Sequence, residues 1–356
     1  MPGARNLGLK LIRPTHTLAA ENPHRGNSTP QRSSPRADTG VASSLRAVFV
    51  LAGNPSGPYG VMTQIALQSL RLTNPGMKTI LICDAKTADD IFRPSHDLMS
   101  VADEILAIEA PYSSATVNSR YLKTKMRSII NGPFVFLDSD ILVRGTLEGL
   151  ADLEASFGGA RNHSLEAFEA QVWDDDREIL RIMNWDVSGF PYINTGVLYF
   201  TDTPAAYEFS DKWHFFWSQS SAATGKHQDQ PAFNKVLRER KSRFSLLPDR
   251  YNAQFKMNAA CIEDALVWHY YGSLGGSRST YFERLVQRVS KGNLRVDQAA
   301  VAELLKNEYP WACETWMDRW VIERSMKRGR MKISEEAWLA RRFARHLFEF
   351  LGSRFR

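Results

Sequence analysis

The chain of 356 residues has few cysteines and no long apolar segment. Its three cysteines, Cys83, Cys261 and Cys313, are far apart, which excludes a disulfide framework and favours a reducing compartment. No apolar run approaches the roughly 18 residues that a membrane span needs. The amino-terminal residues also lack the apolar core of a secretory signal. We therefore expect a cytoplasmic protein.

The chain also lacks an even distribution of charge. The formal net charge is +6, but residues 1–45 carry six Lys or Arg against two acids, and residues 320–356 carry ten against four. The body between them is therefore mildly acidic. Basic ends suit a nucleic acid or an anionic membrane surface equally well, so the net charge alone indicates neither. We expect no nucleic-acid partner.

With 43% hydrophobic and 24% charged residues, the composition is that of an ordinary globular protein. Residues 1–45 are rich in proline, serine and threonine and show no apolar periodicity, so we interpret them as a disordered basic tail and not as a transit peptide. A buried strand at residues 46–52, a helix at about 61–72 and a strand at 78–83 form a βαβ unit. The loop after the first strand lacks the G-x-G-x-x-G spacing of dinucleotide-binding proteins.

Two aspartates interrupt a run of large apolar residues at positions 134–143. In an extended chain Asp138 and Asp140 point the same way and Ser139 points the other way. Two acids directed at one point repel each other unless a cation lies between them. The stretch therefore predicts a divalent metal site at the carboxyl end of a central strand; the alternative is a pair of turn or N-cap carboxylates where the strand ends.

A basic helix precedes this strand. It runs from about residue 119 to 131 and carries Arg120, Lys123, Lys125 and Arg127. Basic residues beside a carboxylate metal site suit a phosphate-bearing ligand. For Lys125 and Arg127 a solvated helix face is an equal alternative. A third strand is expected before it, at 103–108.

Further elements follow the two aspartates. We expect a strand near 157–160 and a helix at 165–183. The helix carries Asp174, Asp175 and Asp176, and three consecutive acids point in different directions around a helix axis. They cannot all face one metal, so we interpret them as a solvated face. Asn194 and Thr195 open a buried strand at 191–200, where Gly196 permits a ligand to approach closely.

The helix expected at about 204–220 is rich in aromatic residues, which we interpret as packing in the core. Pro231 lies in the first turn of a helix that follows Asp229 and Gln230, and His269 ends an apolar strand, which by itself is typical of a core residue.

Together these segments resemble glycosyltransferase family eight, whose members have the GT-A fold and include glycogenins and lipopolysaccharide galactosyl- and glucosyltransferases. The resemblance covers about residues 48–272. It rests on five motifs in order: Ser119-Arg120-x-x-Lys123, Phe-Leu-Asp138-x-Asp140, Tyr192-x-Asn194-x-Gly196-Val197, Gln228-Asp229-Gln230-x-x-x-Asn234, and His269. It implies an α/β fold with a mainly parallel central sheet flanked by helices, over a catalytic domain of residues 46–277.

The resemblance also implies a chemistry: transfer of a hexose, from UDP-glucose or UDP-galactose, to a glycan or lipid-linked acceptor. Asp138, Asp140 and His269 would bind Mn²⁺ or Mg²⁺, with Mn²⁺ preferred because one ligand is nitrogen. The metal would stabilise the departing diphosphate, helped by Arg120 and Lys123. The remaining nucleotide contacts would be Ala52, Asn54, Tyr59, Ser139 and Arg278.

Family eight enzymes retain the anomeric configuration, by front-face substitution through an oxocarbenium-like state. The position beneath the anomeric carbon corresponds to Gln230, a poor nucleophile, so we assign Gln230 to stabilising the cationic sugar. Asp229 and Asn194 would bind its hydroxyls. Two departures from the family pattern matter: Gly53-Asn54 replaces an acid after the first strand, and Ser273-Leu274-Gly275-Gly276-Ser277-Arg278 replaces a lysine followed by proline and tryptophan. Arg278 is the remaining candidate to stabilise the leaving group.

The region 278–356 lies outside the resemblance and is expected to be a helical extension, with helices at about 281–290, 297–308, 312–327 and 334–351. The last has an apolar stripe beside arginines, which fits either a helix bound to the anionic inner face of a membrane or a stripe packed on the catalytic domain. Two other functions remain open from the residues: a sugar-nucleotide or glycan-binding protein without catalysis, and a phosphatase of the haloacid-dehalogenase type.

Overall fold

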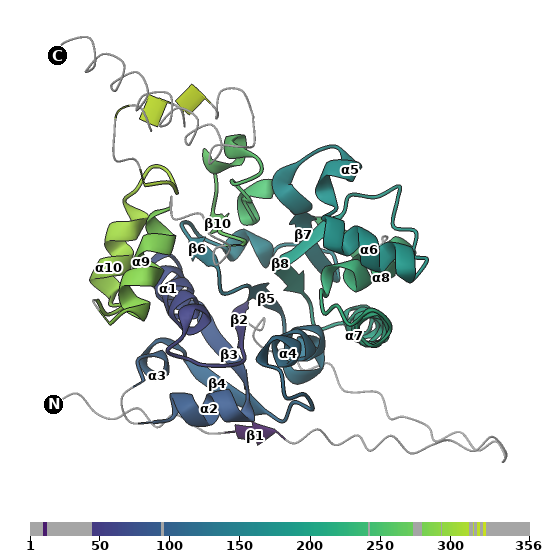
Figure 1. Ribbon diagram of the computed structural model, residues 1–356, viewed down its shortest axis with the longest axis horizontal. Helices are drawn as coiled ribbons and strands as arrows, with labels where there is room; N and C mark the ends of the chain where they lie inside the picture. Colours follow the sequence, from purple (N-terminus) through teal and green to yellow (C-terminus); the bar gives the residue numbers. More distant parts are fainter. Residues whose placement is uncertain are drawn as a thin grey trace, which may run out of the picture.

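The computed structural model describes residues 10–12, 45–93, 96–240, 243–272, 280–292, 294–312, 316, 319–320 and 323–324. A mixed sheet lies at its centre (Figure 1), with eight strands in the order β1-β4-β3-β2-β5-β8-β7-β9. These strands are β1 (Lys10–Ile12), β2 (Arg46–Leu51), β3 (Lys78–Asp84), β4 (Glu104–Ile108), β5 (Phe134–Leu137), β7 (Phe157–Arg161), β8 (Ile193–Phe200) and β9 (Phe244–Leu246).

The half of the sheet from β1 to β5 is parallel. Strands β2, β3, β4 and β5 are mostly buried on both faces, as is usual for parallel strands covered by crossover helices. Alternate residues point to opposite sides: Phe49 and Leu81 join one core cluster, whereas Val48 and Ile80 join another. The first cluster is covered by helices α1 (Pro58–Thr73), α2 (Ala85–Ile91) and α3 (Leu98–Val101), and the second by α4 (Ala115–Ile129), α7 (Pro204–Thr224) and α8 (Gln230–Arg240).

The direction of the chain reverses at β8. It pairs antiparallel with β5 on one side and with β7 on the other. This places the start of β8, at Ile193 and Asn194, beside the end of β5, because antiparallel neighbours present opposite ends at the same sheet edge.

A second, two-stranded sheet continues from β5. Strand β6 (Ile141–Val143) pairs antiparallel with β10 (Val267–His269), and the register sets His269 opposite Ile141. The pairing therefore brings His269 to the residue that follows Asp140, although the two are far apart in sequence.

Two helices of the carboxyl-terminal region complete the core. Helices α9 (Tyr281–Ser290) and α10 (Gln298–Leu305) lie beside α1 (Figure 1) and share with it and with β6 and β10 a hydrophobic cluster that contains Ile65, Leu142 and Phe282. A capping box of Thr280 and Glu283 starts α9. The expected helix at 334–351 and most of the one at 312–327 lie outside the described residues. Within the described residues, no helix has the length and apolar character required to cross a membrane.

Three predicted elements were wrong. The expected helix at 165–183 is two helices, α5 (Phe168–Gln171) and α6 (Asp174–Ile182), separated by extended backbone at Val172 and Trp173. The basic helix begins at Ala115, four residues earlier than predicted. Residues 10–12, expected to be without structure, form β1 along the edge of β4.

Candidate active site

The two aspartates lie in a turn and not within one strand. Strand β5 ends at Leu137, and β6 begins at Ile141 in a different sheet. The argument from alternation along an extended chain was therefore wrong, although the site does lie at the carboxyl end of a central strand. The backbone N–H of Asp138 donates to Gly196 O at 2.8 Å, and the Ser139 hydroxyl meets that of Thr63 at 2.9 Å. These bonds fix the turn to β8 and to α1.

Asp138, Asp140 and His269 converge. One ligand atom from each lies within 4.8 Å of the others, and His269 Nε2 is 3.3 Å from Asp140 Oδ1. Burial raises the pKa of Asp140, but the neighbouring His269 outweighs it, and the net pKa lies below its ordinary value. Among the described residues this is the only group of three or more acidic, histidine or cysteine side chains that could hold a metal.

Gly196 explains how His269 comes so near to β8. A Cβ at this position would lie 2.4 Å from His269 Cε1 and 2.9 Å from Asn194 Oδ1, so any larger residue would displace the ring. The close approach predicted for Gly196 is thus made by the histidine itself.

A chain of amides orients the imidazole. The backbone N–H of Gly196 donates to Asn194 Oδ1 at 2.8 Å, which fixes the direction of that amide because a backbone N–H can only donate. Asn252 Nδ2 donates to the same oxygen at 2.9 Å, so Asn252 Oδ1 faces His269 Nδ1 at 2.8 Å. His269 must donate from Nδ1, so Nε2, the nitrogen that faces Asp140, is the one that could bind a metal.

The donor set fits a divalent cation. Two carboxylates and one imidazole are hard and borderline ligands of the kind that Mn²⁺ and Mg²⁺ take, with diphosphate oxygens left to complete an octahedron. The imidazole is directed by a partner on its other nitrogen, as is usual for a ligating histidine.

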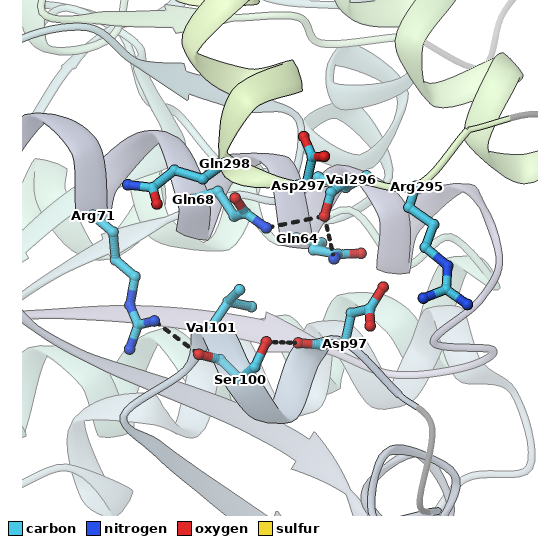
Figure 2. Close-up of a pocket in the computed structure, with 10 residues that line it drawn as sticks. All are labelled: Gln64, Gln68, Arg71, Asp97, Ser100, Val101, Arg295, Val296, Asp297 and Gln298. Atoms are coloured by element: carbon cyan, nitrogen blue, oxygen red, sulfur yellow. Dashed lines mark hydrogen bonds between the residues drawn. The ribbon is translucent and has the colours of Figure 1, made fainter. Parts of the chain in front are cut away.

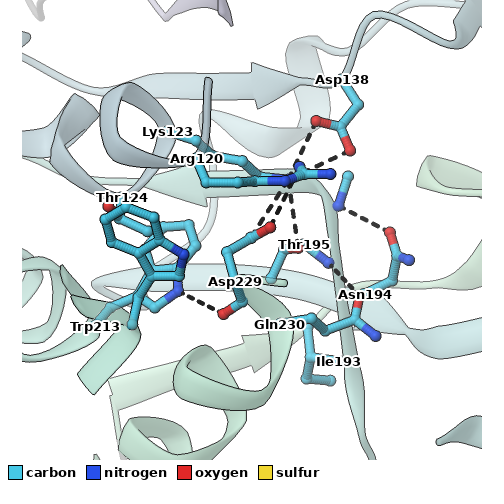
Figure 3. A network of polar contacts seen from close by, with 12 residues as sticks. Arg120, Lys123, Thr124, Asp138, Ile193, Asn194, Thr195, Trp213, Asp229 and Gln230 are labelled. Atoms are coloured by element: carbon cyan, nitrogen blue, oxygen red, sulfur yellow. Dashed lines mark hydrogen bonds and ion pairs between the residues drawn. The ribbon is translucent and has the colours of Figure 1, made fainter. Parts of the chain in front are cut away.

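Two basic side chains from α4 lie between the metal-ligand turn and the start of α8 (Figure 3). Lys123, only 2% exposed, lies 3.1 Å from Asp138 Oδ1 and 3.5 Å from Asp229 Oδ2, and Arg120 lies 3.3 Å from Asp229 Oδ1. Burial raises the pKa of Asp229, but Lys123 and Arg120 reverse this and lower it. Both side chains therefore lie beside the proposed metal site, and their contact with a diphosphate stays a prediction.

Arg127 proves to be structural. It is buried, and its guanidinium donates to the carbonyls of Gly132 and Thr201 at 2.8 and 3.0 Å, away from the aspartate turn. Neither of the two interpretations of Arg127 applies, a phosphate contact or a solvated face, because its guanidinium is buried and donates to backbone carbonyls after α4 and β8.

Gln230 and Asn194 have their amides occupied within the protein. Gln230 Oε1 accepts from Thr195 N at 3.2 Å, and its Nε2 donates to Asp176 at 3.2 Å. Asn194 accepts from Gly196 and Asn252 and donates to Asn162. In this structure Asn194 thus orients His269 through Asn252.

Asp176 is a residue that the sequence prediction missed. It was assigned to a solvated face, but it is 3% exposed and accepts from both Tyr192 Oη at 3.1 Å and Gln230 Nε2 at 3.2 Å. Burial raises its pKa to about 7. The sequence did contain an indication of this burial. The apolar residue Ile179 lies three residues later, and residues at i and i+3 share a helix face, so Asp176 lies on the apolar face of the helix. Asp174 and Asp175 are exposed as predicted.

The expected nucleotide contacts lie at the end of β2 and the start of α1. Ala52 is half-buried, whereas Asn54 and Tyr59 are exposed, Tyr59 by 57%. Gly60 fits only because it has no Cβ, which would lie 1.8 Å from Pro55 O. Arg278 lies outside the described residues.

A separate polar cavity of about 450 Å³ lies between α1, α3 and the segment before α10 (Figure 2). Gln64 and Gln68 both donate to Val296 O, at 3.0 and 3.1 Å, and Arg71 donates to Ser100 O at 2.8 Å. The two glutamine bonds tie the segment before α10 to α1, and the arginine bond ties α3 to α1. The cavity contains none of the predicted site residues.

A comparison with known families decides between the functions that the sequence left open. The sequence profile described as glycosyl transferase family 8 matches residues 80–274, which is more than half of the chain. The chain belongs to this family. It is a glycosyltransferase with the predicted α/β GT-A fold, and the phosphatase alternative is wrong. Enzymes of glycosyltransferase family 8 generally use a metal and a nucleotide-sugar, and the Asp138, Asp140 and His269 group is where this family 8 enzyme could hold the metal.

Two solved structures are similar to this family 8 chain. Mouse xyloside xylosyltransferase 1 in its apo form has a TM-score of 0.42 and 13% identity, over 64% of this chain and 98% of that one. The glycosyltransferase GlyE of Streptococcus pneumoniae TIGR4 has a TM-score of 0.47 and 17% identity, over 77% of this chain and 68% of that one. No curated protein matches the chain.

Proposed function

We propose that this glycosyltransferase moves a hexose from UDP-glucose or UDP-galactose to a glycan or lipid-linked acceptor, with retention, and that it needs Mn²⁺ or Mg²⁺. The observation that carries the proposal is the convergence of three ligand side chains beside two buried or half-buried cations: Asp138, Asp140 and His269 next to Lys123 and Arg120.

The charges of these groups suit a diphosphate. In the protein alone, Lys123 neutralises Asp138 and, with Arg120, Asp229. A divalent cation held by Asp138, Asp140 and His269 would supply Lewis-acid stabilisation of the leaving diphosphate. Lys123 and Arg120 would add fixed positive charge to a group whose negative charge grows as the glycosidic bond breaks.

Gln230 is proposed to face the anomeric carbon. Thr195 N and the Asp176 carboxyl hold its amide in one orientation. An amide oxygen accepts through two lone pairs, so the one not used by Thr195 can stabilise an oxocarbenium-like sugar. Retaining hydrolases instead place a carboxylate nucleophile about 5 Å from the acid. Asp229 is the nearest carboxylate in sequence, but its ion pairs with Lys123 and Arg120 favour a role in holding a sugar hydroxyl.

Nucleotide-sugar binding with and without metal tests the proposal. UDP-glucose, UDP-galactose and the GDP and ADP sugars would be compared by thermal shift and by release of nucleoside diphosphate, in Mn²⁺, Mg²⁺ or EDTA. We expect stabilisation and turnover with a UDP-hexose only when metal is present, loss of both in Asp140→Ala, and no change in Asp174→Ala, an exposed acid of α6. Stabilisation without turnover would favour a binding protein, and no response to any nucleotide would contradict the proposal.

A lipid-linked acceptor would bring the enzyme to a membrane. We propose, as part of the same function, that residues 334–351 attach a cytoplasmic enzyme to anionic lipid; these residues lie outside the described part of the chain. Flotation with anionic liposomes would compare the full chain with a 1–330 truncation, and equal recovery would contradict the attachment.

A further inference from the structure

A large aromatic side chain lies exposed at the margin of the active site. Trp173 is the N-cap residue of α6 and is 44% exposed, although its ring contacts two others. Its centroid lies 4.6 Å from that of His163, at 86°, and 5.8 Å from that of Tyr271, at 71°. Trp173 is therefore held in place by edge-to-face contacts while part of its surface faces solvent.

Two independent paths connect Trp173 to the proposed reacting groups. In the first, the ring of Tyr271 lies 5.9 Å from the ring of His269, the proposed metal ligand. In the second, the first turn of α6 that begins after Trp173 carries Asp176, whose carboxyl contacts Gln230. Trp173 is thus separated by one ring from His269 and by three residues from the carboxyl that contacts Gln230, which connects it to both the metal end and the sugar end of the site.

His163 supports the tryptophan from a strained position. It is 2% exposed, and both it and Ser164 have left-handed backbone, with φ of 61° and 52°. Such strain in non-glycine residues gathers at functional sites. His163 Nδ1 is bonded to Ala170 O at 2.8 Å, whereas Nε2 has no hydrogen-bond partner among the described residues. Bonds from Gln254 and Asn258 also hold the backbone of His163 and Ser164, and the imidazole contacts the rings of both Trp173 and Tyr271.

The chemistry of the surface indicates a sugar ring. A pyranose has apolar C–H faces and a rim of hydroxyls, and it pairs with a rigid aromatic face beside a few polar groups. The nucleobase of the donor is expected at the other end of the diphosphate, near Ala52, Asn54 and Tyr59. The part of the site that Trp173 borders is therefore the part that an incoming acceptor must enter.

We propose that Trp173, backed by Tyr271 and His163, is the acceptor subsite of this enzyme, and that it takes a pyranose ring by stacking. This inference rests on the proposed function, because it assumes that a nucleotide-sugar occupies the neighbouring groups. Trp173 touches the acceptor in this scheme and takes no part in the transfer of the hexose.

The test compares Trp173→Ala and Trp173→Phe with Phe215→Ala, which removes an aromatic ring of α7 that is 55% exposed. Donor hydrolysis by water and transfer to a panel of methyl glucosides, galactosides and xylosides, maltose and lactose are measured for each. We expect Trp173→Ala to raise the acceptor KM about tenfold, with donor hydrolysis and donor KM within about twofold of wild type. Trp173→Phe should lie between, and Phe215→Ala should match wild type.

Three results would overturn the inference: an unchanged acceptor KM in Trp173→Ala, an equal loss of donor binding, or a wild type that hydrolyses its donor but uses no pyranoside. If the wild type turns over no donor, the proposed function fails first. The subsite is then decided by tryptophan fluorescence with the same glycosides, where a change in wild type that Trp173→Phe lacks supports it and no change refutes it.

Discussion

His269 Nδ1 lies 2.8 Å from Asn252 Oδ1, and this contact sets which imidazole nitrogen faces Asp140. The backbone N–H of Gly196 determines the direction of the Asn194 amide, which determines that of Asn252. A rigid backbone donor thus orients the candidate metal ligand His269 through two side-chain amides. The consequence can be measured in the protein with and without metal.

Asn252→Leu should weaken Mn²⁺ binding by about 10- to 100-fold, as loss of an outer partner of a ligating histidine does. Asn252→Asp keeps an acceptor for Nδ1 and should retain more affinity. Calorimetric titration with Mn²⁺ gives the affinities, and ¹⁵N shifts of His269 in the metal-free protein give the tautomer. Asn307→Leu, two residues beyond the end of α10, is the control. Equal affinities in wild type and Asn252→Leu would refute the orienting role.

Gly196→Ala should damage the same site by a steric route. The added Cβ would lie 2.4 Å from His269 Cε1, so the ring or the strand must move, at a cost of about 1–3 kcal/mol in stability. Gly76→Ala adds a Cβ with no atom within 4 Å and is the matched control. Urea unfolding and Mn²⁺ titration of both variants check this, and a Gly196→Ala protein as stable and as metal-competent as wild type would contradict the geometry.

Lys123→Met should destabilise the metal-free enzyme strongly. The substitution leaves Asp229, 4% exposed, without its closest buried cation, and breaking a buried ion pair costs about 3–5 kcal/mol. The pKa of Asp229 should rise, because Lys123 is the charge that most lowers it. Lys212→Met, which removes a surface pair with Glu208, should change the free energy of unfolding by less than about 1 kcal/mol. Similar losses in the two variants would argue against the buried network.

Asp176 should make stability depend on pH. Its pKa is raised from 3.8 to about 7, so between these values the folded state binds more protons than the unfolded state. Its contribution to the free energy of unfolding must therefore fall as pH rises from about 4 to about 7, by up to about 1.4 kcal/mol per pH unit. Asp176→Asn removes this slope, so its stability relative to wild type should increase over that range. Urea unfolding at pH 5, 6, 7 and 8 tests this, with Asp174→Asn as control; parallel pH curves for wild type and Asp176→Asn would disprove it.

Gln230→Ala should slow hexose transfer on the order of 100-fold, the usual effect of removing one group that stabilises a charged transition state. Donor KM should change little, because the proposed contacts of the diphosphate are made by other residues. Asp140→Ala should abolish transfer. If Gln230→Ala left the transfer rate unchanged while Asp140→Ala abolished it, the role of Gln230 would be wrong.

The sequence by itself determined the strands and helices whose formation depends on the pattern of a few neighbouring residues. Apolar runs and the stops between them located β2, α1, β3, β4 and α8, because burial of a strand or of a helix face is encoded within a few neighbouring residues. Four motifs identified the family by their order and spacing: Asp138-x-Asp140, Asn194-x-Gly196, Asp229-Gln230 and His269. The same strands and helices, in the same order, are needed to bring such residues together, so the motifs recur in that order.

Only the tertiary structure decided which groups each side chain contacts and whether it is buried. Asp138 and Asp140 converge because the chain turns from one sheet into another between β5 and β6, a change of direction that an apolar run does not reveal. Asp176 was read as solvated because burial of one acid in a run depends on Tyr192 and Gln230, which come from other elements. The amide chain from Gly196 to His269 and the position of Trp173 likewise join residues distant in sequence, and such contacts arise only when the whole sheet is assembled.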